Sequence, residues 1–164
     1  MSIRTDLERA AGASWSDDRV CIRPIETQDE LAYAIFGCQL TEEQAELVNP
    51  AGFSIGRAYL FREDNLPCII YNEQKGPIGF INFAKWLGKG DAYSWSSLID
   101  KNQQGKGYGR NAAQLAVRLL KAANPAKPIK LSAEKNNEKA RRLYTLLGFR
   151  LLSELDGDDL VFEL

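Results

Sequence analysis

Gln104-Gly105-Lys106-Gly107-Tyr108-Gly109 decides the fold, together with Asn137-x-x-Ala140-x-x-Leu143-Tyr144-x-x-x-Gly148-Phe149 further along the chain. The three glycines of the first segment let backbone N–H groups converge on a ligand without side chains in the way. The N-terminus of the helix that follows adds partial positive charge, and Lys106 and Arg110 add full charges. The first segment therefore predicts a site for a diphosphate.

Two other phosphate-binding patterns do not fit this segment. The Walker pattern G-x-x-x-x-G-K-[ST] is absent, because Asp100 stands five residues before Gly105 and Gly107 follows Lys106. The Rossmann pattern G-x-G-x-x-G fails, because Arg110 occupies its last position. A glycine-rich turn that only caps a helix remains the alternative for this segment taken alone.

The second segment presents an amide and a phenol on one side of a helix. Asn137, Ala140 and Tyr144 are spaced by three and four residues, which places them on one helical face. A phenol with a pKa near 10 is protonated at neutral pH and can donate a proton. The alternative is that Tyr144 is a core aromatic residue beside Leu143 and Leu147.

Composition indicates one globular domain and excludes several kinds of chemistry. The chain has 164 residues, of which 45% are hydrophobic and 26% charged, and it has no apolar run long enough to span a bilayer. The segment Met1–Glu8 lacks the apolar core of a signal peptide, so a cytoplasmic protein without membrane contact is expected. The absence of histidine excludes Ser-His-Asp and Cys-His nucleophiles, and the three cysteines show no zinc spacing, so no metal is expected.

Charge is unevenly distributed along the chain. The net charge is −1, which argues against a nucleic-acid partner. Residues 1–100 carry −6, residues 101–150 carry +10 and residues 151–164 carry −5. An anionic ligand is therefore expected at the positive block and a cationic one at an acidic block, unless the charges only cluster on solvated faces.

Turn and capping signals divide the chain into helices and strands. Thr27 with Glu30, and Thr41 with Gln44, predict two capped helices, and Asn49-Pro50-Ala51-Gly52 is expected to end the second. The predicted strands are 20–25, 67–71, 78–83, 92–99, 129–132, 149–154 and 160–164, and longer helices are predicted from 107 and over 137–147. This pattern predicts a single α/β (α+β) domain with a mostly antiparallel first half.

The two segments together resemble the cofactor motifs of the GNAT superfamily of acyl-CoA-dependent N-acyltransferases. The resemblance implies a mixed, mostly antiparallel sheet flanked by helices, with a splayed strand pair that holds acetyl-CoA. It also implies a cofactor site formed by Ser97, Leu98, Ile99, Gln104, Gly105, Lys106, Gly107, Tyr108, Gly109, Arg110, Asn137, Ala140 and Tyr144. Strand residues 97–99 would offer unpaired backbone groups to the pantetheine arm and to the thioester oxygen.

The resemblance also implies the catalytic groups. Tyr144 would be the general acid that protonates the departing thiolate. Glu134 is a candidate for the base that deprotonates the amine, and Asp100 and a water chain are alternatives. No cysteine lies in the motif region, which favours direct attack over an acyl-enzyme.

Further segments resemble bacterial spermine/spermidine (diamine) N-acetyltransferases, including Leu131-Ser132-Ala133-Glu134 and Asp156-Gly157-Asp158-Asp159. This implies a polyamine or diamine acceptor, to which Glu42, Glu43 and Glu46 would bind unless they form a solvated face. The sequence departs from that pattern at Ser96 and at Asn49-Pro50-Ala51, on the acceptor side. An aminoglycoside, an amino acid, a protein amine or a non-catalytic CoA-binding module therefore remain alternatives.

The resemblance covers residues 20–164, which are assigned to one N-acetyltransferase domain. Residues 1–19 are assigned to an N-terminal extension, either a short helix or a loose arm. Homodimers are common in the family that the chain resembles.

Overall fold

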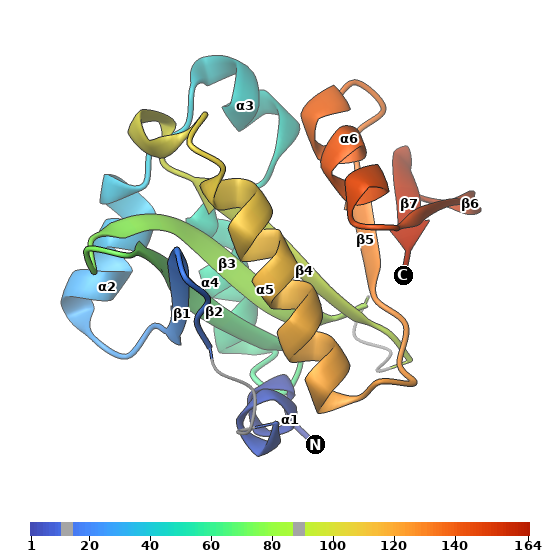
Figure 1. Cartoon of the computed structure of the whole chain (residues 1–164), viewed down its shortest axis with the longest axis horizontal. Helices are drawn as coiled ribbons and strands as arrows, with labels where there is room; N and C mark the ends of the chain where they lie inside the picture. Colours follow the sequence, from blue (N-terminus) through green and yellow to red (C-terminus); the bar gives the residue numbers. More distant parts are fainter. Residues whose placement is uncertain (11–14, 87–90) are drawn as a thin grey trace.

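Two antiparallel sheets lie side by side, and helices cover both faces of the larger one (Figure 1). The computed structural model describes residues 1–10, 15–86 and 91–164. Within them, the strand orders are β1-β2-β3-β4 and β5-β7-β6. The strands are β1 (Val20–Pro24), β2 (Asn65–Asn72), β3 (Pro77–Lys85), β4 (Tyr93–Ile99), β5 (Lys130–Ala133), β6 (Arg150–Asp156) and β7 (Asp159–Glu163). The predicted antiparallel meander is thus confirmed for β2, β3 and β4.

Helices form where the capping signals predict them. Both capping boxes are present, Thr27 with Glu30 and Thr41 with Gln44. The helices are α1 (Ile3–Arg9), α2 (Gln28–Ala32), α3 (Glu42–Leu47), α4 (Ala51–Leu60), α5 (Tyr108–Ala123) and α6 (Glu138–Leu146), with a π-helical turn at Tyr33–Gly37 and a 3-10 turn at Lys101–Gln103.

Helix α5 covers one face of the larger sheet and forms the main core with it (Figure 1). Its inward residues recur every three to four positions and are at most 1% exposed: Ala112, Ala113, Leu115, Ala116, Leu119 and Leu120. They pack against alternate strand residues such as Ile81 and Phe83. The N-terminus of α5 therefore lies at the end of β4, where the glycine loop enters.

Helix α4 lies on the opposite face and was not predicted. Its Ala51 packs with Ile69 and Phe80 in a second cluster. The segment Asn49-Pro50-Ala51-Gly52 was expected only to end a helix, but Pro50 is the residue directly before α4. Proline is tolerated at a helix start, so it separates α3 from α4 rather than beginning a loop.

Helix α1 packs into the main core. Ile3 and Leu7 are 0% exposed, and the Ile3 N–H donates to the Glu63 carbonyl at 2.9 Å. The Tyr93 hydroxyl donates to Asp6 at 2.9 Å, which ties α1 to β4. Residues 3–9 are therefore a docked helix and not a loose arm. The division of the chain at residue 20 stays a prediction.

Candidate active site

The two sheets separate along the edge of β4. In the described residues, β4 and β5 share only a parallel bridge between Tyr93 and Ile129, where the Tyr93 N–H donates to the Pro128 carbonyl at 2.9 Å. Beyond this point the strands diverge (Figure 1). The splay leaves one edge of β4 open toward β5, as the sequence predicted.

Alternation along β4 decides which backbone groups face the opening. The Asp100 N–H donates to the Ile78 carbonyl of β3. Backbone groups point to alternate sides along a strand, so those of Leu98, two residues earlier, also point to β3. Ser97 and Ile99 face the opening instead. The prediction that Leu98 offers unpaired backbone groups is therefore wrong, because strand pairing uses them, and only its side chain reaches the cavities.

The glycine loop places backbone amides at the end of this opening. Gly105 and Gly107 have φ of +77° and +86°, a left-handed backbone that side chains disfavour. Gly107 is the N-cap residue of α5 and makes no side-chain cap, so the first N–H groups of the helix remain for a ligand. The loop and the helix start therefore form an anion site of the kind that a diphosphate requires.

A cavity of about 180 Å³ joins the loop, the β4 edge and α6. It brings together most of the predicted cofactor residues: Ser97, Leu98, Ile99, Gln104, Gly105, Gly107, Tyr108, Gly109, Asn137 and Ala140. A Cβ built on Gly105 would meet nothing within 4 Å, so space lies open beside this residue. The chain thus fits a phosphate-bearing cofactor with an extended arm along β4.

Five predicted cofactor side chains have other partners or lie outside this cavity, among them Tyr144, which lines the neighbouring cavity. Gln104 exchanges hydrogen bonds with Gln44 of α3, at 2.6 and 2.8 Å, and donates to the Ile99 carbonyl. The Tyr108 hydroxyl donates to Glu73, so only its backbone remains for a ligand. The two cations, Lys106 and Arg110, are exposed and do not line the cavity.

Helix α6 brings its predicted face to the opening. Asn137 caps this helix, because its Oδ1 accepts the Ala140 N–H at 3.2 Å. The NH₂ group of Asn137 is therefore the part left for a ligand. Asn137 lines both the cofactor cavity and the larger cavity beside it.

Tyr144 of α6 lies on the wall of the larger cavity. Its ring packs against Phe149 and Phe162, with centroids 5.9 and 5.4 Å away, and it lines the larger cavity. Burial raises the pKa of Tyr144 to about 12, so the hydroxyl keeps its proton at neutral pH. No group in the described parts of the chain hydrogen-bonds to this hydroxyl, which leaves it for a ligand.

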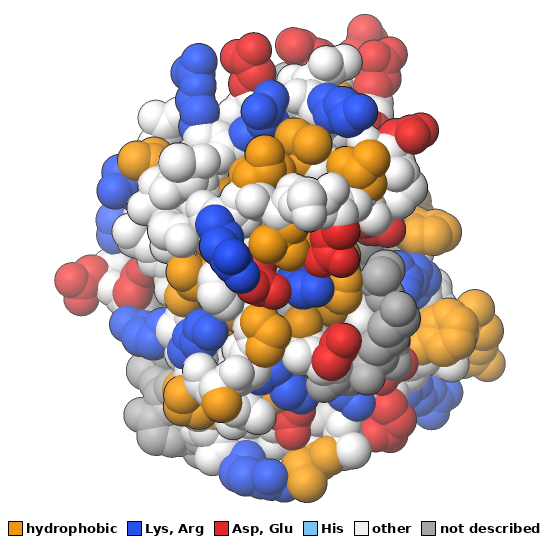
Figure 2. All heavy atoms as spheres, turned by 90° about the vertical axis from the view of Figure 1, so that its right-hand side faces the viewer, with side chains coloured by type: hydrophobic (Ala, Val, Ile, Leu, Met, Phe, Trp, Pro, Cys, Tyr) orange, Lys and Arg blue, Asp and Glu red, His pale blue; other side chains and the backbone are white. Residues whose placement is uncertain are grey.

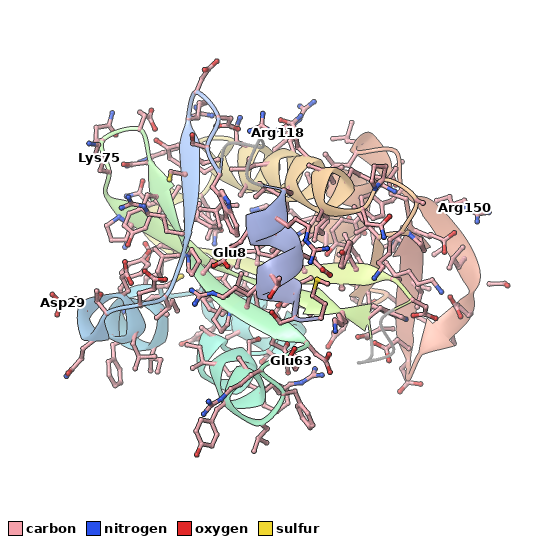
Figure 3. The ribbon with its side chains drawn as sticks, turned by 90° about the horizontal axis from the view of Figure 1, so that it is seen from below. Glu8, Asp29, Glu63, Lys75, Arg118 and Arg150 are labelled. Carbon is pink, nitrogen blue, oxygen red and sulfur yellow. The ribbon has the colours of Figure 1, made fainter. Side chains whose placement is uncertain are left out.

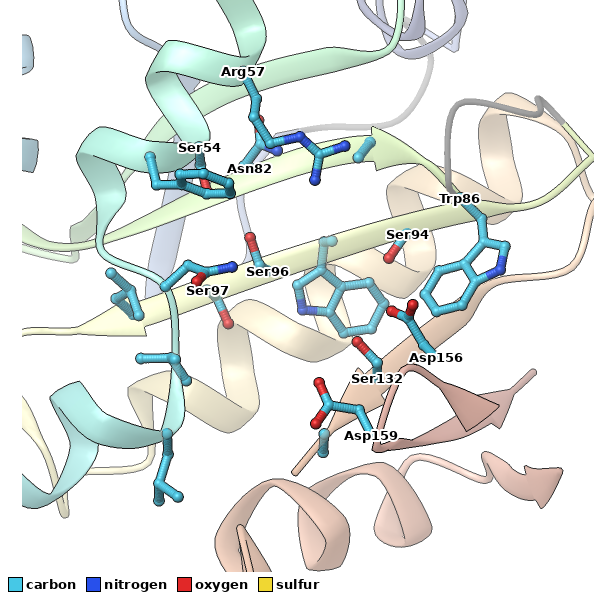
Figure 4. A pocket seen from close by; sticks show the side chains of 18 of the residues that line it. Ser54, Arg57, Asn82, Trp86, Ser94, Ser96, Ser97, Ser132, Asp156 and Asp159 are labelled. Atoms are coloured by element: carbon cyan, nitrogen blue, oxygen red, sulfur yellow. The ribbon is translucent and has the colours of Figure 1, made fainter. Parts of the chain in front are cut away.

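The larger cavity, of about 310 Å³, has opposite charges on its two sides. Figure 4 shows Arg57 and Asn82 on one side and Asp156 and Asp159 on the other. Glu134 also lines it. Burial raises the pKa of Asp159, and the charges of Asp156 and Asp158 raise it further. A cation bound on the acidic side would relieve this repulsion.

The alternative base, Asp100, is committed to the fold. Its Oδ2 accepts the Gln39 N–H and its Oδ1 accepts the Asn102 N–H, both at 2.9 Å. The side chain is 8% exposed and lines neither of the two cavities. Of the two carboxylates, Glu134 is therefore the one that can meet a ligand in the larger cavity.

The predicted acidic helix face points away from the cavities. Glu42, Glu43 and Glu46 are exposed on α3 and line neither cavity, whereas Gln44 and Leu47 of the same helix do. Helical spacing groups these glutamates correctly but cannot say which side of α3 meets the protein. Besides Glu134, the acids that line the cavity are Asp156 and Asp159, which come from the C-terminal block, whose −5 charge was the signal for them.

The surface over β6 and β7 is not dominated by charges of one sign. Acidic, basic and hydrophobic side chains alternate over it (Figure 2). Three exposed leucines, Leu146, Leu151 and Leu155, contribute to its hydrophobic surface. Across residues 1–10, 15–86 and 91–164, no helix has the length and apolar character that crossing a membrane requires.

Comparison with known proteins connects this geometry to one family. Residues 29–149 match the family model described as the acetyltransferase (GNAT) family. A probable spermine N(1)-acetyltransferase of Bacillus subtilis subsp. natto (strain BEST195) is 41% identical over 59 residues. That match spans 36% of this chain and 39% of the relative.

Solved acetyltransferase structures share the fold. Aminoglycoside acetyltransferase AAC(6')-Ib in complex with coenzyme A has a TM-score of 0.70, with 21% identity over 88% of this chain and 94% of that one. An acetyltransferase of Agrobacterium tumefaciens str. C58 has a TM-score of 0.68, with 17% identity over 91% and 92%. The predicted fold class is confirmed.

Proposed function

Because the chain belongs to the acetyltransferase (GNAT) family, we propose that it transfers the acetyl group of acetyl-CoA to a primary amine, most suitably a polyamine or diamine. One observation carries the proposal. The protonated Tyr144 hydroxyl lies on the larger cavity, which shares Ser97, Leu98 and Asn137 with the cofactor cavity. Donor and acceptor molecules that occupied the two cavities would therefore meet beside Tyr144.

Each group at this junction has a role in the proposal. Acetyl-CoA supplies a thioester whose acyl carbon an amine can attack. The Ser97 N–H, on the open edge of β4, would stabilise negative charge on the acyl oxygen. As the new C–N bond forms and the C–S bond breaks, Tyr144 would give its proton to the sulfur. Glu134, or water, would take the proton of the amine.

The cofactor residues follow from the first cavity. The amides of Gly105 to Gly109 would hold the diphosphate, with Lys106 and Arg110 adding long-range attraction at the surface. Asn137 and Ala140 would border the pantetheine arm. This assignment keeps the predicted cofactor residues but gives Gln104 a supporting role, since its amide holds the Ile99 carbonyl and α3.

Two findings favour a polyamine acceptor. The acidic side of the larger cavity, with Glu134, Asp156 and Asp159, suits a cationic chain. The 59-residue match to a probable spermine N(1)-acetyltransferase points the same way.

The direct test follows thiol release from acetyl-CoA with separate acceptors: spermidine, spermine, putrescine, an aminoglycoside and amino acids. Release with polyamines alone is the expected result. Release only with another amine would overturn the acceptor class. Tight CoA binding without release from any amine would favour a non-catalytic CoA-binding module.

A second acceptor class, an amine that also carries a carboxylate, is favoured by Arg57. This side chain lines the cavity opposite the acids and has no anionic partner within the described chain. Arg57→Gln separates the two classes. For a polyamine, kcat/KM should stay constant or rise, because a repelling charge is removed. For an amino acid it should fall about 10-fold or more, because an ion pair is lost.

A further inference from the structure

One buried oxygen on the floor of the larger cavity has no donor. Asn82 of β3 is 6% exposed and lines this cavity. Its Oδ1 is buried, and no group in the described residues donates to it. Buried polar atoms in folded proteins nearly always have a partner, so an unpaired acceptor on a residue that lines a cavity indicates a site for a ligand donor.

A chain of amides fixes which end of Asn82 is open. The Phe61 carbonyl can only accept, so the end of Asn65 that faces it must be the NH₂ group, at 3.1 Å. Asn65 then turns its Oδ1 to Asn82, which must offer its own NH₂, at 3.0 Å. The open atom of Asn82 is therefore its oxygen, and it selects an N–H or O–H donor.

The position of Asn82 separates it from the reacting centre. Asn82 pairs with Ser96 across β3 and β4, so it lies one strand in from the open edge of β4. Strands are about 4.8 Å apart, so the backbone of Asn82 is one strand spacing away from β4. Figure 4 shows Asn82 beneath Arg57, across the cavity from Asp156 and Asp159.

We propose that Asn82 is a specificity-determining residue of the acceptor site, whose Oδ1 accepts a hydrogen bond from a second nitrogen of the acceptor, remote from the attacked amine. This inference rests on the proposed function and refines it. The acceptor would carry at least two nitrogen donors along a chain. An amine of the same length without the second nitrogen would leave the Asn82 oxygen unpaired and lose the benefit of the site.

The experiment compares putrescine with pentylamine, which replaces the second nitrogen by a methyl group. Both amines are assayed with the wild-type chain and with Asn82→Leu, in which leucine is close in size but offers no hydrogen-bond acceptor. Wild type should prefer putrescine in kcat/KM, and Asn82→Leu should lower that preference by about 10-fold to 100-fold. Ser153→Ala, exposed on β6 and outside both cavities, is the control and should leave the preference unchanged.

A second variant tests the inference even if Asn82→Leu destabilises the protein. Asn82→Leu leaves the Asn65 oxygen without its hydrogen-bond donor. The double variant Asn65→Leu/Asn82→Leu removes both members of the pair, so neither side chain leaves an unpaired group. Both variants should lose the putrescine preference. An unchanged preference in a folded variant would overturn the inference.

Calorimetric binding of putrescine to the CoA-bound protein separates the inference from the proposed function. Binding that weakens in Asn82→Leu, without thiol release in wild type, would support the Asn82 site and reject the transfer reaction. Thiol release in wild type, together with putrescine binding that is the same in Asn82→Leu, would support the transfer reaction and reject the Asn82 site.

Discussion

At the scale of single residues, the site depends on polar groups that the fold leaves without protein partners. Among the described residues, no group hydrogen-bonds to the Tyr144 hydroxyl on the cavity wall, whereas both carboxylate oxygens of Asp100 accept hydrogen bonds from backbone N–H groups. The sequence alone offered both residues for catalysis. Hydrogen-bond partners, which depend on the fold, distinguish the group that can react from the group that holds a loop.

Replacing Tyr144 by phenylalanine tests its role as the acid. Tyr144→Phe should lower kcat by about 100-fold or more, because it removes the proton donor, while the KM for acetyl-CoA changes little. Because burial raises the pKa of Tyr144 to about 12, wild-type kcat should show no loss from its deprotonation up to pH 10. Steady-state rates against pH check both points, and an unchanged kcat in the variant would remove the assigned role.

Variants can test whether a cationic acceptor binds at the acidic side of the larger cavity or at the exposed glutamates of α3. Asp159→Asn should raise the KM for spermidine, because a cation loses its partner, and should leave the KM for acetyl-CoA unchanged. The same change should not lower stability at neutral pH, because the raised pKa of Asp159 shows that its charge is disfavoured in the folded protein. Spermidine titrations and urea unfolding measure the two effects.

Glu46→Gln is the matched control, since Glu46 is exposed on α3 and lines neither cavity. A rise in the spermidine KM for Glu46→Gln, without one for Asp159→Asn, would instead support an acceptor site at the exposed glutamates of α3.

At the scale of elements, the cofactor cavity depends on how the loop enters α5 and how β4 leaves β5. The left-handed backbone of Gly107 turns the chain into α5 with its first N–H groups exposed. The paired amides of Gln44 and Gln104 hold α3 against the same loop. The cavity is therefore built by the ends of three elements, and not by one motif.

Gly107→Ala should destabilise the protein by about 1–2 kcal/mol, because alanine is strained at this positive φ, and should raise the KM for acetyl-CoA. Gly56→Ala is the control, because Gly56 lies inside α4 and a Cβ there meets nothing within 4 Å. It should stabilise the protein by about 0.5–1 kcal/mol. Urea unfolding and acetyl-CoA titrations check the pair, and equal effects of both variants would contradict the backbone argument.

At the scale of the whole molecule, α1 is part of the structure that supports β4. Its Ile3 and Leu7 lie in the same core as α5 and the larger sheet. Seen from below, α1 lies across the sheet beside α5, and the charged residues labelled in that view are all exposed (Figure 3). We therefore expect the folding of the sheet and the docking of α1 to be coupled.

Leu7→Ala should lower the free energy of unfolding by about 2–5 kcal/mol, because a fully buried side chain leaves a cavity. The melting temperature should fall by roughly 5–15 °C. Glu8→Ala, one residue along on the exposed side, should change stability by less than about 0.5 kcal/mol, since its ion pair with Arg4 is exposed. Thermal unfolding of both variants checks this, and equal melting temperatures would show that α1 is a dispensable extension.

The sequence by itself determined most of the elements and the family of this protein. Capping boxes at Thr27 and Thr41, the glycines before α5 and the spacing of α6 are local signals, because neighbouring residues set backbone conformation and helix faces. Family and fold follow from these signals. The start of α4 was missed because proline marks a helix start as well as a turn.

Only the tertiary structure shows the cavity that we propose for the acceptor. Asn82, Arg57 and Asp159 come from β3, α4 and β7, and no spacing along the chain relates them. Strand register determines that Leu98 pairs with β3 while Ser97 stays open, and helix orientation turns Glu42, Glu43 and Glu46 outward. The physical reason is that a diphosphate loop is a contiguous backbone conformation, whereas the acceptor cavity is assembled from elements that only long-range packing brings together.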